Sequence, residues 1–209
     1  MIVETHLHTF FSDGLHSPLD MARRVKSLKL NGFAITDHDT VKGQKAAKIA
    51  AKQLKLKLIP GIEVSSTDGH VIGLFVEKEI PRLSAAEVVE LIHDEGGIAI
   101  AAHPHCRFRP SVGDLIKTVK FDYVEIFNTR VPWIPDNWKT QGIAKEMNLK
   151  GIAASDAHAI EEVGFGTTRV KDFGDFENGK AKVASARWTG PWLIGYGKFR
   201  RFLRKNKLY

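Results

Sequence analysis

The sequence contains one cysteine, no long apolar run and, after Glu177, no acidic residue. The single cysteine, Cys106, excludes an internal disulfide framework and predicts a reducing, cytoplasmic setting. No apolar run approaches the roughly 18 residues of a membrane span, so we expect no membrane partner. The N-terminal residues run directly into His6 and His8, and this start predicts no signal peptide.

Positive charge exceeds negative charge by 7, but the excess lies at one end of the chain. The segment after Glu177 holds nine of the 31 Lys and Arg residues, so the rest of the chain has 22 basic and 24 acidic residues. A basic helix is expected at about residues 192–209. It either closes the fold with a solvated basic face or binds RNA or DNA, and the sequence leaves both interpretations open.

The length of 209 residues and the hydrophobic content of 43% predict a single domain over residues 1–209. Short apolar runs alternate with segments of helical period, which indicates an α/β fold with a mostly parallel sheet. The expected strands are residues 2–5, 32–36, 58–62, 70–76, 97–102, 123–127, 151–154 and 167–170. The expected helices are residues 18–30, 42–56, 84–95, 112–119 and 136–147, the first and third beginning after Ser17 and Ser84.

Polar residues follow the expected strands where each strand ends. In a β/α barrel these ends converge on one face, so ligands that are distant in sequence become neighbours in space. His6 and His8 lie two apart on an extended segment, and their side chains therefore project to the same side. Imidazole and carboxylate ligands suit zinc, manganese or iron. The series comprises His6, His8, Asp13, His38, Glu63, His70, His103, Asp156 and His158.

Six ordered motifs resemble those of the PHP (polymerase and histidinol phosphatase) family, and the match extends from residue 3 to about residue 170. The motifs are His6-Leu7-His8 with Ser12-Asp13-Gly14, Ile35-Thr36-Asp37-His38-Asp39, Gly61-Ile62-Glu63-Val64-Ser65, His70-Val71-Ile72-Gly73, Ala102-His103-Pro104 and Ser155-Asp156-Ala157-His158. The resemblance implies a distorted seven-stranded (β/α)7 barrel and a trinuclear metal centre that hydrolyses phosphate esters.

The resemblance also implies a division of the ligands among three divalent ions (Zn, Mn or Fe). The first ion takes His6, His8, Glu63 and Asp156; the second takes Glu63, His70 and His103; the third takes Asp13, His38 and His158. A hydroxide bridging the metals is expected to attack phosphorus, with the carboxylates of Asp13, Glu63 and Asp156 as the catalytic ones. The surplus positive charge of such a centre favours a phosphate dianion.

Other residues near strand ends are candidates for supporting roles. Asp37 and Asp39 flank His38, and we expect them to orient ligand imidazoles. Arg107, Arg109 and Arg130 are candidates for binding substrate phosphate, and Arg130 is the first choice. His105, two residues after His103, is either a substrate contact or a residue of the rim.

The leading hypothesis is a phosphoesterase acting on a nucleotide or another small phosphomonoester. The alternative within that class is an exonuclease or polynucleotide end-processing enzyme, and residues 74–102 leave room for only one helix, which predicts an open site. A metal-dependent amidohydrolase is less favoured because Glu63 occupies the bridging position. A non-catalytic scaffold is also less favoured because every expected ligand is present. The sequence does not specify an oligomeric state.

Overall fold

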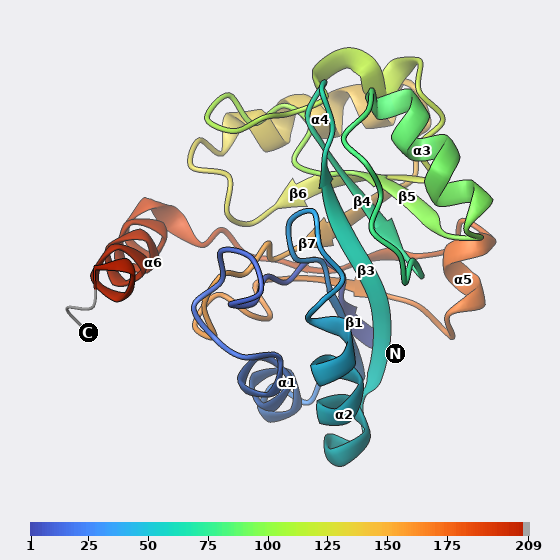
Figure 1. Ribbon diagram of the computed structural model, residues 1–209. Helices are drawn as coiled ribbons and strands as arrows, with labels where there is room; N and C mark the ends of the chain where they lie inside the picture. Colours follow the sequence, from blue (N-terminus) through green and yellow to red (C-terminus); the bar gives the residue numbers. More distant parts are fainter. Residues whose placement is uncertain (207–209) are drawn as a thin grey trace.

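The computed structural model describes residues 1–206, except for the side chains of Lys198, Arg204 and Lys205. Strands and helices alternate along most of the chain (Figure 1). The strands are β1 (Ile2–Glu4), β2 (Gly32–Ile35), β3 (Lys57–Ser65), β4 (His70–Leu74), β5 (Ile98–Ala101), β6 (Tyr123–Asn128), β7 (Gly151–Ala154), β8 (Gly166–Arg169) and β9 (Lys182–Ala186). The helices are α1 (Pro18–Ser27), α2 (Gln44–Leu54), α3 (Ala85–Asp94), the 3-10 helix η1 (Gly113–Lys117), α4 (Pro135–Glu146), α5 (Gly174–Glu177) and α6 (Gly190–Lys205).

Side-chain caps set where α1 and α3 begin. The Ser17 hydroxyl accepts a hydrogen bond from the backbone N–H of Asp20 at 3.1 Å, and Pro18 takes the first helical position. Ser84 and Glu87 form the same reciprocal capping box at the start of α3. Each cap satisfies backbone donors that the helix itself leaves unpaired, which contributes about 1 kcal/mol. Both predicted helix starts are confirmed.

The strands form one sheet in the order β7-β6-β5-β4-β3-β2-β1-β8-β9, which curls into a nearly closed barrel. Its inner strands pair in parallel except around β4, which is antiparallel to both neighbours. Side chains join β7 to β8 at the seam. The Ser155 hydroxyl donates to the Gly166 carbonyl at 3.1 Å, and the Thr168 hydroxyl donates to the Ala153 carbonyl at 3.0 Å.

The predicted number of seven strands is wrong, because the sheet has nine. β8 pairs antiparallel with β1, and β9 pairs antiparallel with β8. β9 was not expected from the sequence. Its residues, Lys-Val-Ala-Ser-Ala, are mostly exposed and lack the apolar alternation that marks a half-buried strand. The short α5 was also not expected.

The turn between β3 and β4 fixes the register of two predicted ligands. Ser65 pairs with His70, and Glu63 pairs with Ile72 two residues deeper in the hairpin. Gly69 in the turn has φ +139°, and a Cβ at this position would lie 2.4 Å from the backbone of Ser111. Glycine is therefore required at this turn, both by its backbone conformation and by the close approach.

Three clusters of buried apolar residues surround the sheet. One packs α3 and η1 against β3–β6, and a second packs α1 and α2 against β2 and the start of β3. A third includes residues of β1–β7 together with Phe176 of α5. α6 stands off at one side of this body (Figure 1). It begins at Gly190, and the last three residues of the predicted helix lie outside the described part of the chain. Within residues 1–206, every helix is too short or too polar to cross a membrane.

Candidate metal centre

His6 and His8 emerge just after β1 and aim their imidazoles at the same point. Their Nε2 atoms lie 3.0 Å apart, and each lies 3.1 Å from Oε2 of Glu63. Oδ1 of Asp156 lies 3.3 Å from Nε2 of His8 and 3.7 Å from Nε2 of His6. All four side chains are buried. These are the residues that the family resemblance assigns to a first metal, and the structure brings them together.

The second predicted group gathers around the other oxygen of Glu63. Oε1 lies 3.1 Å from Nδ1 of His70 and 3.3 Å from Nε2 of His103. His38 also approaches Glu63, because its Nδ1 lies 3.3 Å from Oε2. Glu63 therefore stands between two sets of imidazoles, as expected of a bridging carboxylate. His103 has φ +31°, a left-handed conformation that is uncommon outside glycine and frequent at functional sites.

The third predicted group lies at the solvent side of the cluster. Oδ1 of Asp13 lies 3.0 Å from Nε2 of His158 and 3.9 Å from Nε2 of His38. Nδ1 of His8 is 3.8 Å from the same oxygen, so His8 borders both this group and the first. The side chain of Asp13 is 40% exposed and that of His38 is 26% exposed, whereas Glu63 is 1% exposed. Solvent therefore reaches the cluster from the Asp13 side.

The buried polar atoms of the cluster suit a cation better than they suit one another. Among the described residues, seven buried ligand atoms have no hydrogen-bond partner of acceptable geometry: His8 Nδ1, Asp13 Oδ1, His38 Nδ1, Glu63 Oε1, His70 Nδ1, His103 Nε2 and Asp156 Oδ1. An unpaired buried polar atom costs about 1–3 kcal/mol, so such a concentration requires an explanation. Nitrogen and carboxylate oxygen atoms facing a common centre are the donor set of a transition-metal site, and the residues fit divalent ions.

The two buried carboxylates among the predicted ligands, Glu63 and Asp156, are held in their charged form. Burial alone would raise the pKa of Glu63, but the imidazoles of His38 and His6 hold it well below its usual range. Burial would likewise raise the pKa of Asp156, which Arg109 and His6 keep well below its usual range. Both groups are therefore anions at neutral pH, ready to neutralise a cation.

The imidazoles divide into two kinds. Burial lowers the pKa of His103 to about 4 and that of His158 to about 3, so both are neutral and able to ligate a metal. For His8, burial is outweighed by Asp156 and Glu63, which raise its pKa to about 9. A proton on His8 thus offsets the carboxylate charge of the metal-free protein. A metal must displace this proton, so the affinity for metal is expected to rise with pH.

Glu125 is a functional residue that sequence reasoning missed. It lies on β6 with no exposed surface, and its Oε1 accepts a hydrogen bond from Nδ1 of His6 at 2.7 Å. Oε2 accepts from the backbone N–H of His103 and from Nδ2 of Asn128, both at 2.8 Å. This arrangement places the proton of His6 on Nδ1 and aims Nε2 at the cluster. The sequence did contain a signal for this role, because Glu125 is a charged residue within a mostly apolar strand.

Arg109, one of the three arginine candidates, contacts the cluster directly. Its guanidinium forms an ion pair with Oδ2 of Asp156, and it lies 3.4 Å from Oδ1 of Asn128. Burial would lower the pKa of Arg109, but Asp156 raises it above its usual range. Arg109 therefore stays charged beside the cluster and holds Asp156 in place.

Asp37 and Asp39, which were expected to orient imidazoles, accept hydrogen bonds from neighbouring loops. Asp37 is buried, and its carboxylate accepts hydrogen bonds from the backbone and hydroxyl of Thr9 and from the hydroxyl of Ser12. Asp39 accepts from the backbone N–H of Ser65 at 2.7 Å. Both carboxylates thus brace loops that carry ligands.

The other three predicted substrate-binding residues are also engaged with protein partners. Arg130 is buried, and its Nε lies 3.2 Å from Oε1 of Glu162. Arg107 forms hydrogen bonds with both carboxylate oxygens of Asp136. His105 contacts the hydroxyl of Thr140 at 2.9 Å and Asp114 at 3.1 Å. The structure thus brings all nine predicted ligands together and leaves His105 and Arg107 outside their cluster.

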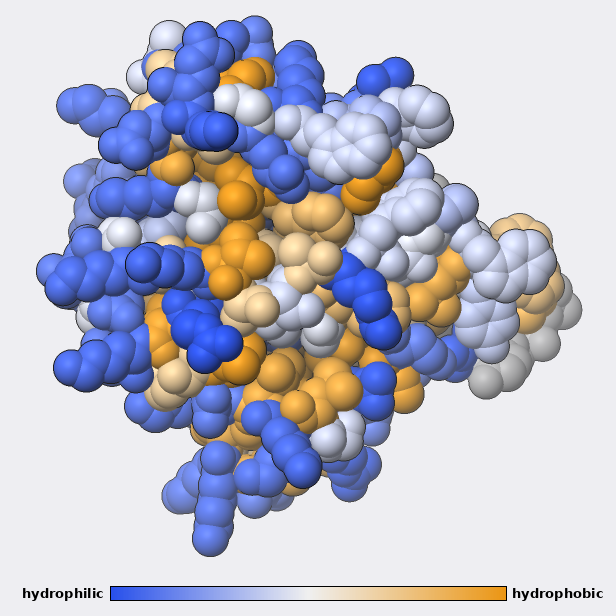
Figure 2. Space-filling view, turned by 180° about the vertical axis from the view of Figure 1, so that it is seen from behind, coloured by the Kyte–Doolittle hydropathy of each residue, from blue (hydrophilic) through white to orange (hydrophobic). Residues whose placement is uncertain are grey.

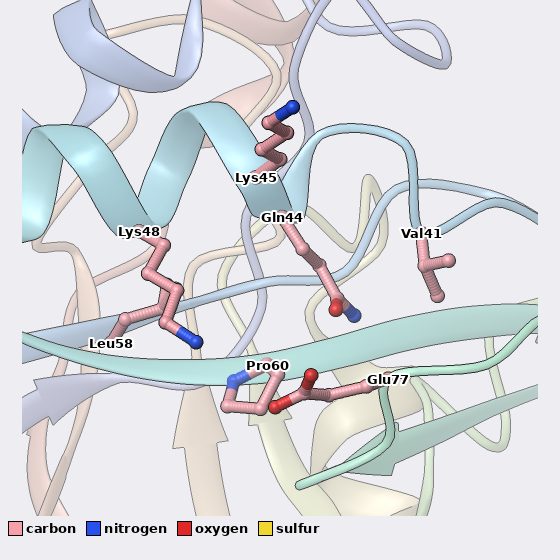
Figure 3. Close-up of a pocket in the computed structure, with 7 residues that line it drawn as sticks. All are labelled: Val41, Gln44, Lys45, Lys48, Leu58, Pro60 and Glu77. Atoms are coloured by element: carbon pink, nitrogen blue, oxygen red, sulfur yellow. The ribbon is translucent and has the colours of Figure 1, made fainter.

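A surface cavity of about 480 Å³ lies between α2 and β3, away from the metal ligands (Figure 3). Lys45, Lys48 and Glu77 contribute its charged side chains. Gln44 donates hydrogen bonds to the carbonyls of Gly61 and Val76 at 3.0 and 2.8 Å, which ties α2 to the sheet. This hollow contains none of the predicted site residues, and we assign it no role in the chemistry.

Comparison with known proteins agrees with the motifs. The family model of the PHP domain matches residues 4–143, and a model described as PHP-associated matches residues 135–186. The uncharacterised protein MJ1587 of Methanocaldococcus jannaschii is 34% identical over 165 residues, which are 73% of this chain and 96% of that protein. The solved structure of PsfC from Pseudomonas syringae has the same fold, with a TM-score of 0.69 at 15% identity over 96% of this chain and 97% of that one.

Two enzymes match over shorter stretches. The 5'-3' exoribonuclease of Haemophilus influenzae is 37% identical over 86 residues, 39% of this chain and 31% of that enzyme. The 3',5'-nucleoside bisphosphate phosphatase of Chromobacterium violaceum is 31% identical over 87 residues, 40% of this chain and 30% of that enzyme. The match thus spans less than a third of the length of either enzyme. The chain belongs to the PHP domain family and is a metal-dependent hydrolase of phosphate esters.

Proposed function

We propose that the cluster holds three divalent ions, Zn, Mn or Fe, and that the protein hydrolyses a nucleotide or another small phosphomonoester. The observation that carries this proposal is the set of seven buried ligand atoms that face one another without hydrogen-bond partners among the described residues. The first ion would be held by His6, His8, Glu63 and Asp156, the second by Glu63, His70 and His103, and the third by Asp13, His38 and His158.

Bound ions of this kind acidify water and stabilise the charge that develops on the oxygens of a phosphate ester. The protein's own contribution is to orient the ligands before substrate arrives. Glu125 fixes the ring of His6, and Arg109 fixes Asp156. The backbone N–H of His158 donates to Glu162 at 2.6 Å, which positions the loop after β7. The substrate enters beside Asp13, where the cluster meets solvent.

Exposed aromatic side chains on α6 favour the alternative of a polynucleotide substrate. Trp192 is 90% exposed, and Tyr196, Phe199 and Phe202 are each at least half exposed, which leaves ring faces free for stacking on bases. Figure 2, seen from behind, shows pale and orange side chains on the part that projects at the right, where α6 lies. The relative named as an exoribonuclease is consistent with this alternative. The hypothesis that the basic C-terminal helix binds RNA or DNA depends partly on Arg204, Lys205 and Lys207, whose side chains lie outside the described part of the chain.

The proposal is tested by turnover with Mn²⁺ or Zn²⁺ on p-nitrophenyl phosphate, nucleoside mono- and bisphosphates, histidinol phosphate and short oligonucleotides. Faster turnover of the small esters supports the first function. Faster turnover of oligonucleotides, lost on Trp192→Ala, supports the alternative. Hydrolysis of any of these phosphate esters would also argue against the amidohydrolase hypothesis, which requires amide cleavage instead.

The trinuclear assignment is tested by Asp13→Ala, with the exposed Asp94→Ala on α3 as matched control. We expect the Asp13 variant to lose about one metal equivalent by elemental analysis and most of its phosphatase rate, because the charged transition state loses electrophilic stabilisation. Wild-type rates with unchanged metal content would refute the assignment.

A further inference from the structure

Two consecutive arginines of α6 point inward, toward the loops that carry the metal ligands. Nη1 of Arg200 lies 3.0 Å from Oε1 of Glu161, in the loop after β7. Nη1 of Arg201 donates to the backbone carbonyl of Asp13 at 3.0 Å and to its carboxylate. These contacts bring the C-terminal helix, remote in sequence, to Asp13, the ligand at the solvent side of the cluster.

α6 is held to the body by Ile194, which is 5% exposed, and by its two inward arginines. Its aromatic residues face solvent, whereas Arg200 and Arg201 are partly buried against the body, with side-chain exposures of 17% and 27%. Holding an arginine side chain in one position costs conformational entropy, and a partly exposed ion pair returns at most about 1 kcal/mol. Stability alone is therefore a weak reason to place Arg201 on Asp13.

Electrostatics changes the role of Arg201 once cations occupy the cluster. Asp13 would then give its charge to a divalent ion, and the guanidinium of Arg201 would stand beside that ion without a counter-charge. An anion that contacts both would relieve this repulsion. The planar guanidinium offers paired N–H donors that match phosphate oxygens, and Arg201 lies at the side of the cluster that solvent reaches.

The arginines expected to bind phosphate are less available for that task. Arg130 is buried against Glu162, and Arg107 is held by both oxygens of Asp136. Neither partner is a proposed metal ligand, so metal binding would release neither arginine. The partners of Arg109 and Arg201, Asp156 and Asp13, are proposed ligands. Asp156 is 1% exposed whereas Asp13 is 40% exposed, so Arg201 is the one of these two arginines that lies where solvent reaches the cluster.

We propose that Arg201 of α6 is a substrate-binding residue that contacts the phosphate group beside Asp13. This inference rests on the proposed function, since it takes Asp13 as a metal ligand and a phosphate ester as substrate. It makes α6 part of the site, so that the enzyme recognises phosphate with a residue that lies outside the PHP-matching segments, residues 4–186.

The test compares Arg201→Gln and Arg201→Lys with Arg200→Gln, a matched control that removes the neighbouring ion pair but no contact to Asp13. Binding of inorganic phosphate to the Mn²⁺-loaded full chain is measured by calorimetry, Mn²⁺ content by elemental analysis, and KM and kcat on the best small ester. We expect Arg201→Gln to weaken phosphate binding about tenfold or more and to raise KM similarly, with Mn²⁺ content unchanged. Arg201→Lys should lose less, and Arg200→Gln less than threefold.

Several outcomes would overturn the proposal. Unchanged phosphate affinity in Arg201→Gln would show that the arginine only neutralises Asp13, and tighter phosphate binding would show that it blocks the site. Equal losses of phosphate affinity in the Arg200 and Arg201 variants would show that both arginines only hold α6 against the body. Loss of Mn²⁺ would make Arg201 a support of the metal site. A wild-type protein that binds phosphate through Arg201 but hydrolyses no ester would instead refute the proposed function.

Discussion

Replacing Glu125 with glutamine tests whether the protein orients its ligands before metal binds. The carboxylate of Glu125 has no exposed surface and accepts three hydrogen bonds, from Nδ1 of His6, the backbone N–H of His103 and Nδ2 of Asn128. A carboxylate has two acceptor oxygens, whereas the amide of glutamine has one acceptor and one donor group. The substitution keeps the shape of the side chain and removes one acceptor.

Neither orientation of the amide satisfies all three partners. With its oxygen toward His6, its NH₂ group faces the N–H donors of His103 and Asn128 at distances of 2.8 Å. With its oxygen toward those donors, its NH₂ group faces Nδ1 of His6 and forces the proton onto Nε2, the atom that must bind metal. A donor left unpaired in a buried site costs about 1–3 kcal/mol. Loss of such an orienting carboxylate lowers metal affinity about 10- to 100-fold.

The assay is a Zn²⁺ or Mn²⁺ titration of the metal-free protein with a competing chelator. Glu90→Gln, the same change on the exposed face of α3, serves as the matched control and should leave the affinity unchanged. Thermal denaturation of both variants reports whether the fold survives. A folded Glu125→Gln protein that binds metal as tightly as the wild type would refute the idea that Glu125 sets the tautomer of His6.

Two further predictions concern buried groups beside the cluster. Burial raises the pKa of Glu4 to about 8, although Ser155 and Gly164 donate hydrogen bonds to it. The folded metal-free protein thus keeps a proton that the unfolded chain releases, so from pH 5 to 8 its free energy of unfolding falls by up to about 1.4 kcal/mol per pH unit relative to Glu4→Gln. Urea denaturation of both proteins measures this, and parallel pH profiles would contradict it. Arg130→Met leaves Oε1 of Glu162 without its ion-pair partner, while the N–H groups of His158 and Ala159 still bind Oε2. We therefore expect urea denaturation to show a loss of about 1–3 kcal/mol. A loss below about 1 kcal/mol would indicate that water replaces the arginine.

The residues that sequence reasoning placed correctly are those whose position follows from local rules. Ser17 and Ser84 cap helices because the spacing of a capping box is short and local. The ligands were expected together because parallel strands present their ends on one face. These rules need no knowledge of side-chain direction, so a single sequence was enough to apply them.

The direction in which a loop side chain points could not be predicted from the sequence. Asp37 and Asp39 flank His38 in sequence, yet both point to loop donors, and Asp39 has φ +53°. A left-handed residue redirects the chain, and no periodicity signals it. α6 raised the same difficulty, because Arg200 and Arg201 lie next to Phe199 and Phe202 along the helix. Spacing alone leaves open which of these residues faces inward.

The two motifs with ligands two residues apart, His6-Leu7-His8 and Asp156-Ala157-His158, pair with each other through their backbones. Leu7, between His6 and His8, forms a parallel bridge with Ala157, the residue between Asp156 and His158. The N–H of His8 donates to the Ala157 carbonyl at 2.9 Å, and the N–H of Ala157 donates to the His6 carbonyl at 3.3 Å. The backbone bonds thus set the spacing between the two ligand pairs, independently of any metal. Leu7 and Ala157 are both fully buried, so a larger side chain at either position would have to open this bridge and separate the two halves of the site.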